Sequence, residues 1–122
     1  MPIFDDLSVR DIQRITSVAT FVRLPTDWSP IGESTGADKA YILLTGEVSV
    51  RKGREEIATL GPGDIFGESA IINHRLRNAS IVTTTPVEVL HLTADAVRRL
   101  CREVPAFKAA LDRAAAERLG SS

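Results

Sequence analysis

The most informative stretch of this chain is residues 66–80, which read Phe66-Gly67-Glu68-Ser69-Ala70-Ile71-Ile72-Asn73-His74-Arg75-Leu76-Arg77-Asn78-Ala79-Ser80. A glycine precedes a short apolar helical turn, and glycine lets a backbone approach a ligand closely. The first N–H groups of that turn, from about Ser69 and Ala70, lack intrahelical partners and face any bound anion. Arg77 offers a planar two-pronged donor for phosphate oxygens, whereas the acceptor Glu68 suits a ribose hydroxyl. This combination suits a nucleoside monophosphate.

The segments before this stretch change from helical to strand-like spacing. Apolar residues recur at three- and four-residue steps over 8–21, with Ser8 as the N-cap, which predicts a helix. The period then becomes two, which predicts short strands at 22–24, 41–44, 48–50, 57–60, 81–85 and 87–92. Thr45-Gly46-Glu47 predicts a hairpin, Lys52-Gly53 a second turn, and Gly61-Pro62-Gly63-Asp64 a tight turn.

The C-terminal portion returns to helical spacing. Thr93 is the expected N-cap, followed by an apolar face that includes Cys101, and Pro105 interrupts this helix or begins the next. Closely spaced short strands favour a roll or sandwich over a parallel sheet. We therefore expect an α+β fold: a jelly-roll-like antiparallel β-roll (22–92) with one N-terminal helix (1–21) and C-terminal helices (93–120), in one domain of 122 residues.

Composition excludes several classes of protein. Fifteen basic and sixteen acidic residues give a net charge of −1, which does not favour a nucleic-acid binder. The basic residues of the last thirty positions are interpreted as a solvated helix face, and no direct nucleic-acid contact is expected. Cys101 is the only cysteine, so a disulfide or multi-cysteine zinc site is ruled out. Without a signal peptide or an apolar run of about 20 residues, the expectation is a cytoplasmic protein that does not contact membranes.

Neither catalysis nor metal binding is predicted. His74 and His91 stand apart, with no cluster of further metal ligands beside either. Ser69 does not lie in a nucleophile elbow and has no identifiable His/Asp partners. Trp28, in a turn rich in proline and serine, is interpreted as a packing residue rather than a ligand platform.

Residues 66–80 resemble the phosphate-binding cassette of cyclic-nucleotide-binding domains, the family found in protein kinase A regulatory subunits, cyclic-nucleotide-gated channels and CRP/FNR regulators. The quoted Phe-Gly-Glu and the arginine nine positions after Glu68 follow the pattern of the kinase and channel members. Residues 41–48 and 58–64 also resemble the family's strand-turn segments before its cassette. The resemblance covers nearly the whole chain. We refer to residues 66–80 as the cassette.

The resemblance implies that the ligand is cAMP or cGMP, with cAMP favoured, and that no cofactor is needed. Glu68 is then expected to accept from the ribose 2′-hydroxyl, and Arg77 to pair with the cyclic phosphate. The implied binding set is Gly67, Glu68, Ser69, Ala70, Arg77, Asn78 and Ala79. Asn78 departs from the small or hydroxyl residue usual at its position, which leaves the base preference open.

The resemblance also implies a moving C-terminal lid. In the family the last helix swings over the nucleotide; here that helix is 105–119, with Leu111, Ala115 and Leu119 as apolar cover. The alternative is that this face packs on the roll or on a partner subunit. We expect ligand binding to shift the population toward the closed lid.

Two other functions compete with the nucleotide sensor. A degenerate roll could serve as a ligand-free dimerisation or partner-docking module, and Asn78 weakly favours this. A cupin-like metalloenzyme shares the double-sheet layout but needs more histidines than this chain offers. A homodimer or an unidentified effector protein is the expected partner, whether the chain is free-standing or a regulatory piece of a larger protein.

Overall fold

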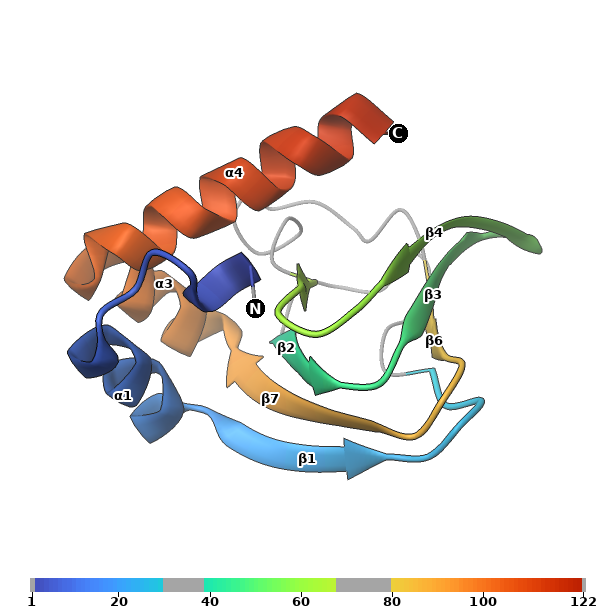
Figure 1. Ribbon diagram of the computed structural model, residues 1–122, viewed down its shortest axis with the longest axis horizontal. Coiled ribbons are helices and arrows are strands. Elements are labelled where there is room, and N and C mark those ends of the chain that lie inside the picture. Colours follow the sequence, from blue (N-terminus) through green and yellow to red (C-terminus); the bar gives the residue numbers. More distant parts are fainter. Residues whose placement is uncertain (1, 30–38, 68–79, 122) are drawn as a thin grey trace.

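The computed structural model describes residues 2–29, 39–67 and 80–121, with side chains described for 3–29, 39–67 and 80–113 (Figure 1). Helices stand at both ends of the chain and strands fill its middle. The elements in chain order are η1 (Pro2–Phe4), α1 (Val9–Val18), β1 (Thr20–Leu24), β2 (Lys39–Thr45), β3 (Val48–Lys52), β4 (Glu55–Leu60), β5 (Ile65–Phe66), β6 (Ser80–Thr83), β7 (Val87–Thr93), α3 (Ala94–Glu103) and α4 (Pro105–Ser121).

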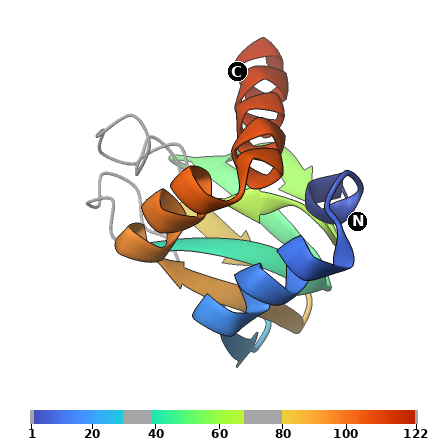
Figure 2. The same ribbon diagram turned by 90° about the vertical axis from the view of Figure 1, so that its left-hand side faces the viewer.

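The strands form two antiparallel sheets, one in the order β1-β7-β2-β5 and the other in the order β4-β3-β6. The helices gather on one side of the strands, where α1 and α3 lie against the four-stranded sheet (Figures 1 and 2). This arrangement confirms the predicted α+β class, with an N-terminal helix, an antiparallel β-roll and C-terminal helices.

The helix boundaries follow from local capping. The Ser8 hydroxyl accepts from the Asp11 N–H at 3.1 Å, and the Asp11 carboxylate accepts in return from the Ser8 N–H at 3.5 Å. Such a capping box satisfies N–H groups that would otherwise lack partners. The Thr93 hydroxyl likewise accepts from the Ala96 N–H at 3.1 Å. Both predicted N-caps are confirmed, and Pro105 begins α4 as the second of its two predicted alternatives.

Two sequence predictions were wrong, one about where the first helix ends and one about which strands pair. The first helix ends at Val18 rather than residue 21, because the backbone from Thr20 onward pairs with β7. The turn at 45–47 does not make a hairpin, because β2 and β3 belong to different sheets. A glycine-containing turn shows that the chain changes direction but does not show which strands pair.

Gly46 is where the chain crosses between the sheets. Its φ is +91°, a left-handed conformation that favours glycine. The turn packs against the second crossing, 84–86, where the Thr84 N–H donates to the Glu47 carbonyl at 3.1 Å. The Glu47 N–H in turn donates to the Thr85 hydroxyl at 3.0 Å. These bonds hold the two crossings together.

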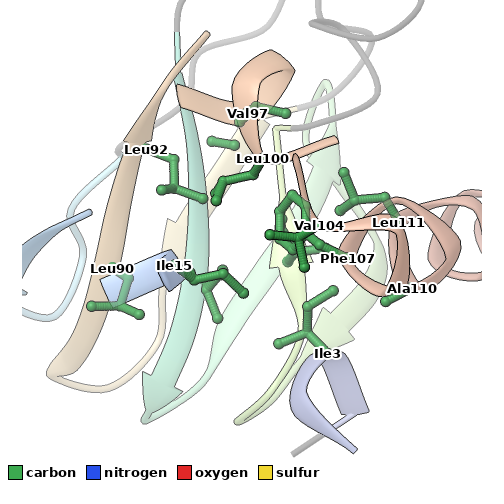
Figure 3. Close-up of a cluster of buried hydrophobic side chains, with 13 residues drawn as sticks. Ile3, Ile15, Leu90, Leu92, Val97, Leu100, Val104, Phe107, Ala110 and Leu111 are labelled. Carbon is green, nitrogen blue, oxygen red and sulfur yellow. The ribbon is translucent and has the colours of Figure 1, made fainter. Parts of the chain in front are cut away.

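The four-stranded sheet has a buried apolar cluster on each of its faces. The helix-side core joins Ala40, Ile42, Ile65, Leu90 and Leu92 of the sheet to Ile3, Ile15, Val97, Leu100, Val104, Phe107, Ala110 and Leu111 (Figure 3). The inter-sheet core consists of Tyr41, Leu43, Val48, Phe66, Ile81, Val87 and Val89. Neighbouring residues of β2 alternate between the two cores, as the pleat of a strand requires.

Candidate functional site

The two ends of the cassette are fixed on different sheets. β5 belongs to the four-stranded sheet and ends at Phe66, whereas β6 belongs to the three-stranded sheet and begins at Ser80. Residues 67–79 therefore connect the two sheets. A ligand bound by these residues would therefore contact the segment that joins the two sheets.

The start of the cassette is held by backbone and ring contacts to β2. The Gly63 N–H donates to the Leu43 carbonyl at 2.7 Å, and the Leu43 N–H donates to the Asp64 carbonyl at 2.8 Å. The Phe66 ring is buried and stacks on Tyr41, with 5.3 Å between ring centroids and 26° between planes. Gly67 follows with a φ of +90°, so the chain turns sharply as it leaves the sheet.

The end of the cassette is held by β3. Ser80 pairs with Arg51 in the sheet register, and its hydroxyl donates to the Arg51 carbonyl at 3.3 Å. The next residue, Ile81, pairs with Val50 and is 6% exposed. The strand is therefore anchored from its first residue onward.

A neighbouring turn is tied to the same strand by the buried residue Thr83. The Thr83 hydroxyl donates to the Pro25 carbonyl at 2.6 Å and accepts from the Trp28 N–H at 2.9 Å. The backbone of Thr83 also bonds to Asp27 and Trp28. The backbone of Trp28 is held in this way, but its side chain is 52% exposed. The predicted packing role therefore applies to only part of the side chain.

Most of the predicted ligand-binding residues lie outside the described part of the chain. Gly67 is described, partly exposed and in the left-handed conformation. The others are Glu68, Ser69, Ala70, Arg77, Asn78 and Ala79. The structure thus places the two ends of the predicted site, and the roles of these residues remain predictions.

The predicted lid residues fall into two groups. Leu111 is fully buried in the helix-side core, near Phe107 and Ala110 of α4 and near Val104, which precedes that helix (Figure 3). This placement agrees with the alternative in which the helix face packs on the roll. Ala115 and Leu119 lie on α4, and their side chains are outside the described part.

The remaining titratable side chains that the sequence singled out, His91, His74 and Cys101, come from different parts of the chain. His91 is half-buried, with its ring centroid 5.3 Å from that of Tyr41, whereas His74 lies outside the described residues. No group of three or more possible metal ligands occurs among the described residues. Partial burial raises the pKa of the Cys101 thiol, and this outweighs the opposing charge of Lys108. Such a thiol is a poor nucleophile.

Several described basic residues of the C-terminal helices lie close to carboxylates. Arg99 Nε is 3.0 Å from Glu103, and Lys108 Nζ is 2.8 Å from Asp112. Arg113 reaches across to Asp6 of the N-terminal segment at 2.5 Å. These pairs support the interpretation of a solvated helix face. None of the described helices is long and apolar enough to span a membrane.

Comparison with known proteins finds one family across the middle of the chain. Residues 30–104 match the family described as "Cyclic nucleotide-binding domain". A "CRP-like cAMP-activated global transcriptional regulator" of Mycobacterium tuberculosis is 30% identical over 122 residues, covering 96% of this chain and 54% of that protein. A "cAMP-dependent protein kinase regulatory subunit" of Yarrowia lipolytica is 31% identical over 102 residues, covering 82% of this chain and 27% of that protein. The chain therefore spans about half the length of the first relative and less of the second.

The fold is also similar to that of a solved structure. The "Catabolite Activator Protein" of Thermus thermophilus superposes with a TM-score of 0.85 at 25% sequence identity. The superposition covers 98% of this chain and 58% of the other. The similarity includes the helices as well as the roll.

Proposed function

Because the chain belongs to the cyclic nucleotide-binding domain family, we propose that it is a regulatory sensor that binds a cyclic nucleoside monophosphate, with cAMP preferred over cGMP. One observation carries the proposal: the Gly67-Glu68 and Arg77 pattern lies within the matched residues 30–104. The anchoring of both ends of the cassette supports it. The relatives named for cAMP support the choice of ligand.

In this proposal the cassette supplies hydrogen-bond donors to the phosphate of the ligand and an acceptor to its ribose. The Arg77 guanidinium pairs with the cyclic phosphate, helped by backbone N–H groups at Gly67, Ala70 and Asn78, with Ser69 and Ala79 lining the site. The Glu68 carboxylate accepts from the ribose 2′-hydroxyl. Hydrogen bonds to charged groups contribute about 1.5–3 kcal/mol each, so Arg77 and Glu68 dominate the affinity. The proposal assigns no catalytic step and no metal.

Binding is proposed to act on α4. The chain breaks between α3 and α4 at Val104, whose backbone is non-helical (φ −128°, ψ 87°), and Pro105 begins the new helix. We assign Leu111 to anchoring the base of α4, because it is fully buried in the helix-side core. Ala115 and Leu119 then remain the candidates for covering the base. A ligand that binds the covered arrangement more tightly shifts the population toward it.

Isothermal titration calorimetry with cAMP and with cGMP tests the proposal. Wild type is expected to bind, with cAMP tighter. Arg77→Ala is expected to lose at least ten-fold in affinity, since about 1.4 kcal/mol corresponds to a factor of ten. Arg77→Lys is also expected to bind poorly, because lysine lacks the two-pronged geometry. Arg75→Ala is the matched control, two residues away, and is expected to bind as wild type does.

A thermal-shift titration separates the sensor from the ligand-free docking module. A nucleotide at 100 times its dissociation constant stabilises the folded state by about 2.7 kcal/mol. Absence of stabilisation by millimolar cAMP and cGMP would reject the sensor in favour of the docking module. Equal binding by wild type and Arg77→Ala would reject the assigned site.

A further inference from the structure

We propose that Tyr41 is a positioning residue for nucleotide binding: its ring holds Phe66 and Gly67 in the place from which the rest of the cassette departs. The inference rests on the proposed function, because it concerns the same site. Tyr41 lies on β2, outside the cassette and twenty-five positions before Phe66.

The geometry places Tyr41 between two other rings on the inter-sheet face. Across the sheet register Tyr41 is paired with Phe66 of β5 on one side and with His91 of β7 on the other. The Tyr41 and Phe66 rings stack at 5.3 Å and 26°, and the Tyr41 and His91 rings are tilted by 60° at the same distance. Tyr41 is 7% exposed and Phe66 is 1% exposed. The contact between the first two rings is therefore almost fully dry.

The ring contact adds to the burial of Ile65 in the helix-side core and of Phe66 in the inter-sheet core, which also hold β5. The strand has only two residues and lies at the edge of its sheet, so β2 is its only strand neighbour in the described structure. The backbone bonds of Leu43 fix the chain at Gly63 and Asp64, before the strand begins. A stacked aromatic pair contributes roughly a two- to ten-fold factor to an equilibrium beyond its buried area. The ring pair thus contributes to fixing the far end of β5.

The position of Phe66 is passed on to the binding residues through Gly67. Gly67 has a φ of +90° and directly precedes Glu68 in the sequence. A displacement of Phe66 therefore moves the start of the segment that carries the proposed ribose acceptor. Misplacement of about 1 Å at a site is enough to weaken its interactions substantially.

Three variants of the full chain test this role by calorimetry with cAMP. Tyr41→Leu removes the ring and is expected to weaken binding about three- to ten-fold. Tyr41→Phe keeps the ring and is expected to retain most of the affinity that Tyr41→Leu loses. Val89→Ala is the matched control, because Val89 lies in the same inter-sheet core but pairs with Leu43 and Val22 rather than with β5. It is expected to lose stability without losing affinity, at a temperature where circular dichroism shows every variant folded.

Hydrogen exchange without nucleotide gives a second, independent readout. Amides of residues 64–67 are expected to exchange faster in Tyr41→Leu than in wild type, and unchanged in Tyr41→Phe and Val89→Ala. Wild-type affinity in Tyr41→Leu overturns the positioning role, as does equal weakening in Tyr41→Phe or in Val89→Ala. If wild type binds neither nucleotide, the proposed function fails while the exchange rates still decide whether the ring holds β5.

Discussion

Gly46 illustrates how one residue permits the crossing between the two sheets. A Cβ at this position would lie 2.5 Å from the Pro86 carbonyl oxygen and 2.7 Å from a Val87 methyl carbon. Gly46→Ala is therefore expected to lower the free energy of unfolding by more than the roughly 1–2 kcal/mol that a left-handed backbone alone costs. Urea denaturation followed by circular dichroism measures this loss.

Gly53 provides the matched control for that prediction. Its φ is also positive, at +64°, but a Cβ there would meet no atom within 4 Å. Gly53→Ala is expected to cost only about 1–2 kcal/mol, the backbone penalty by itself. Equal losses in the two variants would show that the contact with the 84–86 crossing contributes nothing.

The hydroxyl of Thr83 is a second residue-scale feature with a measurable effect. Thr83→Val keeps the shape of the side chain but leaves the Pro25 carbonyl and the Trp28 N–H without the partner they have now. Removing one partner of a buried polar group costs about 1–3 kcal/mol. Because Trp28 is the only tryptophan, its fluorescence reports the turn as well as unfolding.

A similar substitution at an exposed position controls for the change of side chain. Thr59 lies on the exposed strand β4, and Thr59→Val is expected to be within about 0.5 kcal/mol of wild type. If Thr83→Val is equally neutral and its tryptophan emission is unchanged, Thr83 does not hold the turn.

At the scale of elements, an ion pair joins α1 to the end of α3. Arg14 lies 2.8 Å from the Glu103 carboxylate, which Arg99 of α3 also contacts at 3.0 Å. The hydrogen bond from Arg14, with that from Arg99, lowers the pKa of Glu103. A carboxyl group whose pKa is lower in the folded than in the unfolded state stabilises the folded state at neutral pH. This stabilisation is lost as the pH falls from the pKa of glutamate in the unfolded chain, about 4.3, through its lower pKa in the folded state.

Glu103→Gln is therefore expected to be slightly less stable than wild type at pH 7, with the difference shrinking as the pH is lowered through this range. Urea midpoints at a series of pH values measure the difference. Arg14→Gln should show a similar loss, and the double variant should show less than the sum of both losses. Additive losses would mean that α1 and α3 are not coupled by this pair. High salt should reduce the effect, because both side chains are partly exposed.

Elements defined by local chemistry were the ones that the sequence predicted well. Ser8, Thr93 and Pro105 mark helix starts because a cap or a missing N–H acts within a few residues. The strand β5 was not predicted, since two residues carry no periodicity and pair only because β2 lies beside them. The false hairpin at Gly46 has the same origin, because the choice of partner strand is made by contacts distant in sequence.

The candidate site shows the same division between local and distant information. The donor and acceptor chemistry of Gly67, Glu68 and Arg77 could be proposed from residue types and spacing alone. The contribution of Tyr41 could not be proposed in this way, because it stands twenty-five positions before Phe66 and only the sheet register brings the rings together. Leu111 fits both a lid and a core position in the sequence, and only its burial separates these alternatives.

For the whole molecule, the four-stranded sheet is the layer that packs against the helices on one face and against the three-stranded sheet on the other. Its two faces carry the two cores, and β7 runs directly into the Thr93 cap of α3. The first part of α4 is held at Phe107 and Leu111, and Arg113 pairs with Asp6 of the N-terminal segment. Motion of α4 that leaves this core intact is therefore expected in the residues beyond Leu111, the last residue of the helix in this core.

Hydrogen exchange in the presence of saturating cAMP tests this division of α4. Residues 114–119 are expected to exchange more slowly with nucleotide, because the ligand favours the arrangement in which they are covered. Residues 105–111 should exchange slowly in both conditions, since their buried side chains already belong to the helix-side core. Arg77→Ala at the same nucleotide concentration is the control and should behave as the ligand-free protein does. If cAMP binds but exchange is unchanged throughout α4, the helix is not the element that transmits binding. A change confined to 105–111 would instead place the moving part at the Val104 break and remove the anchoring role of Leu111.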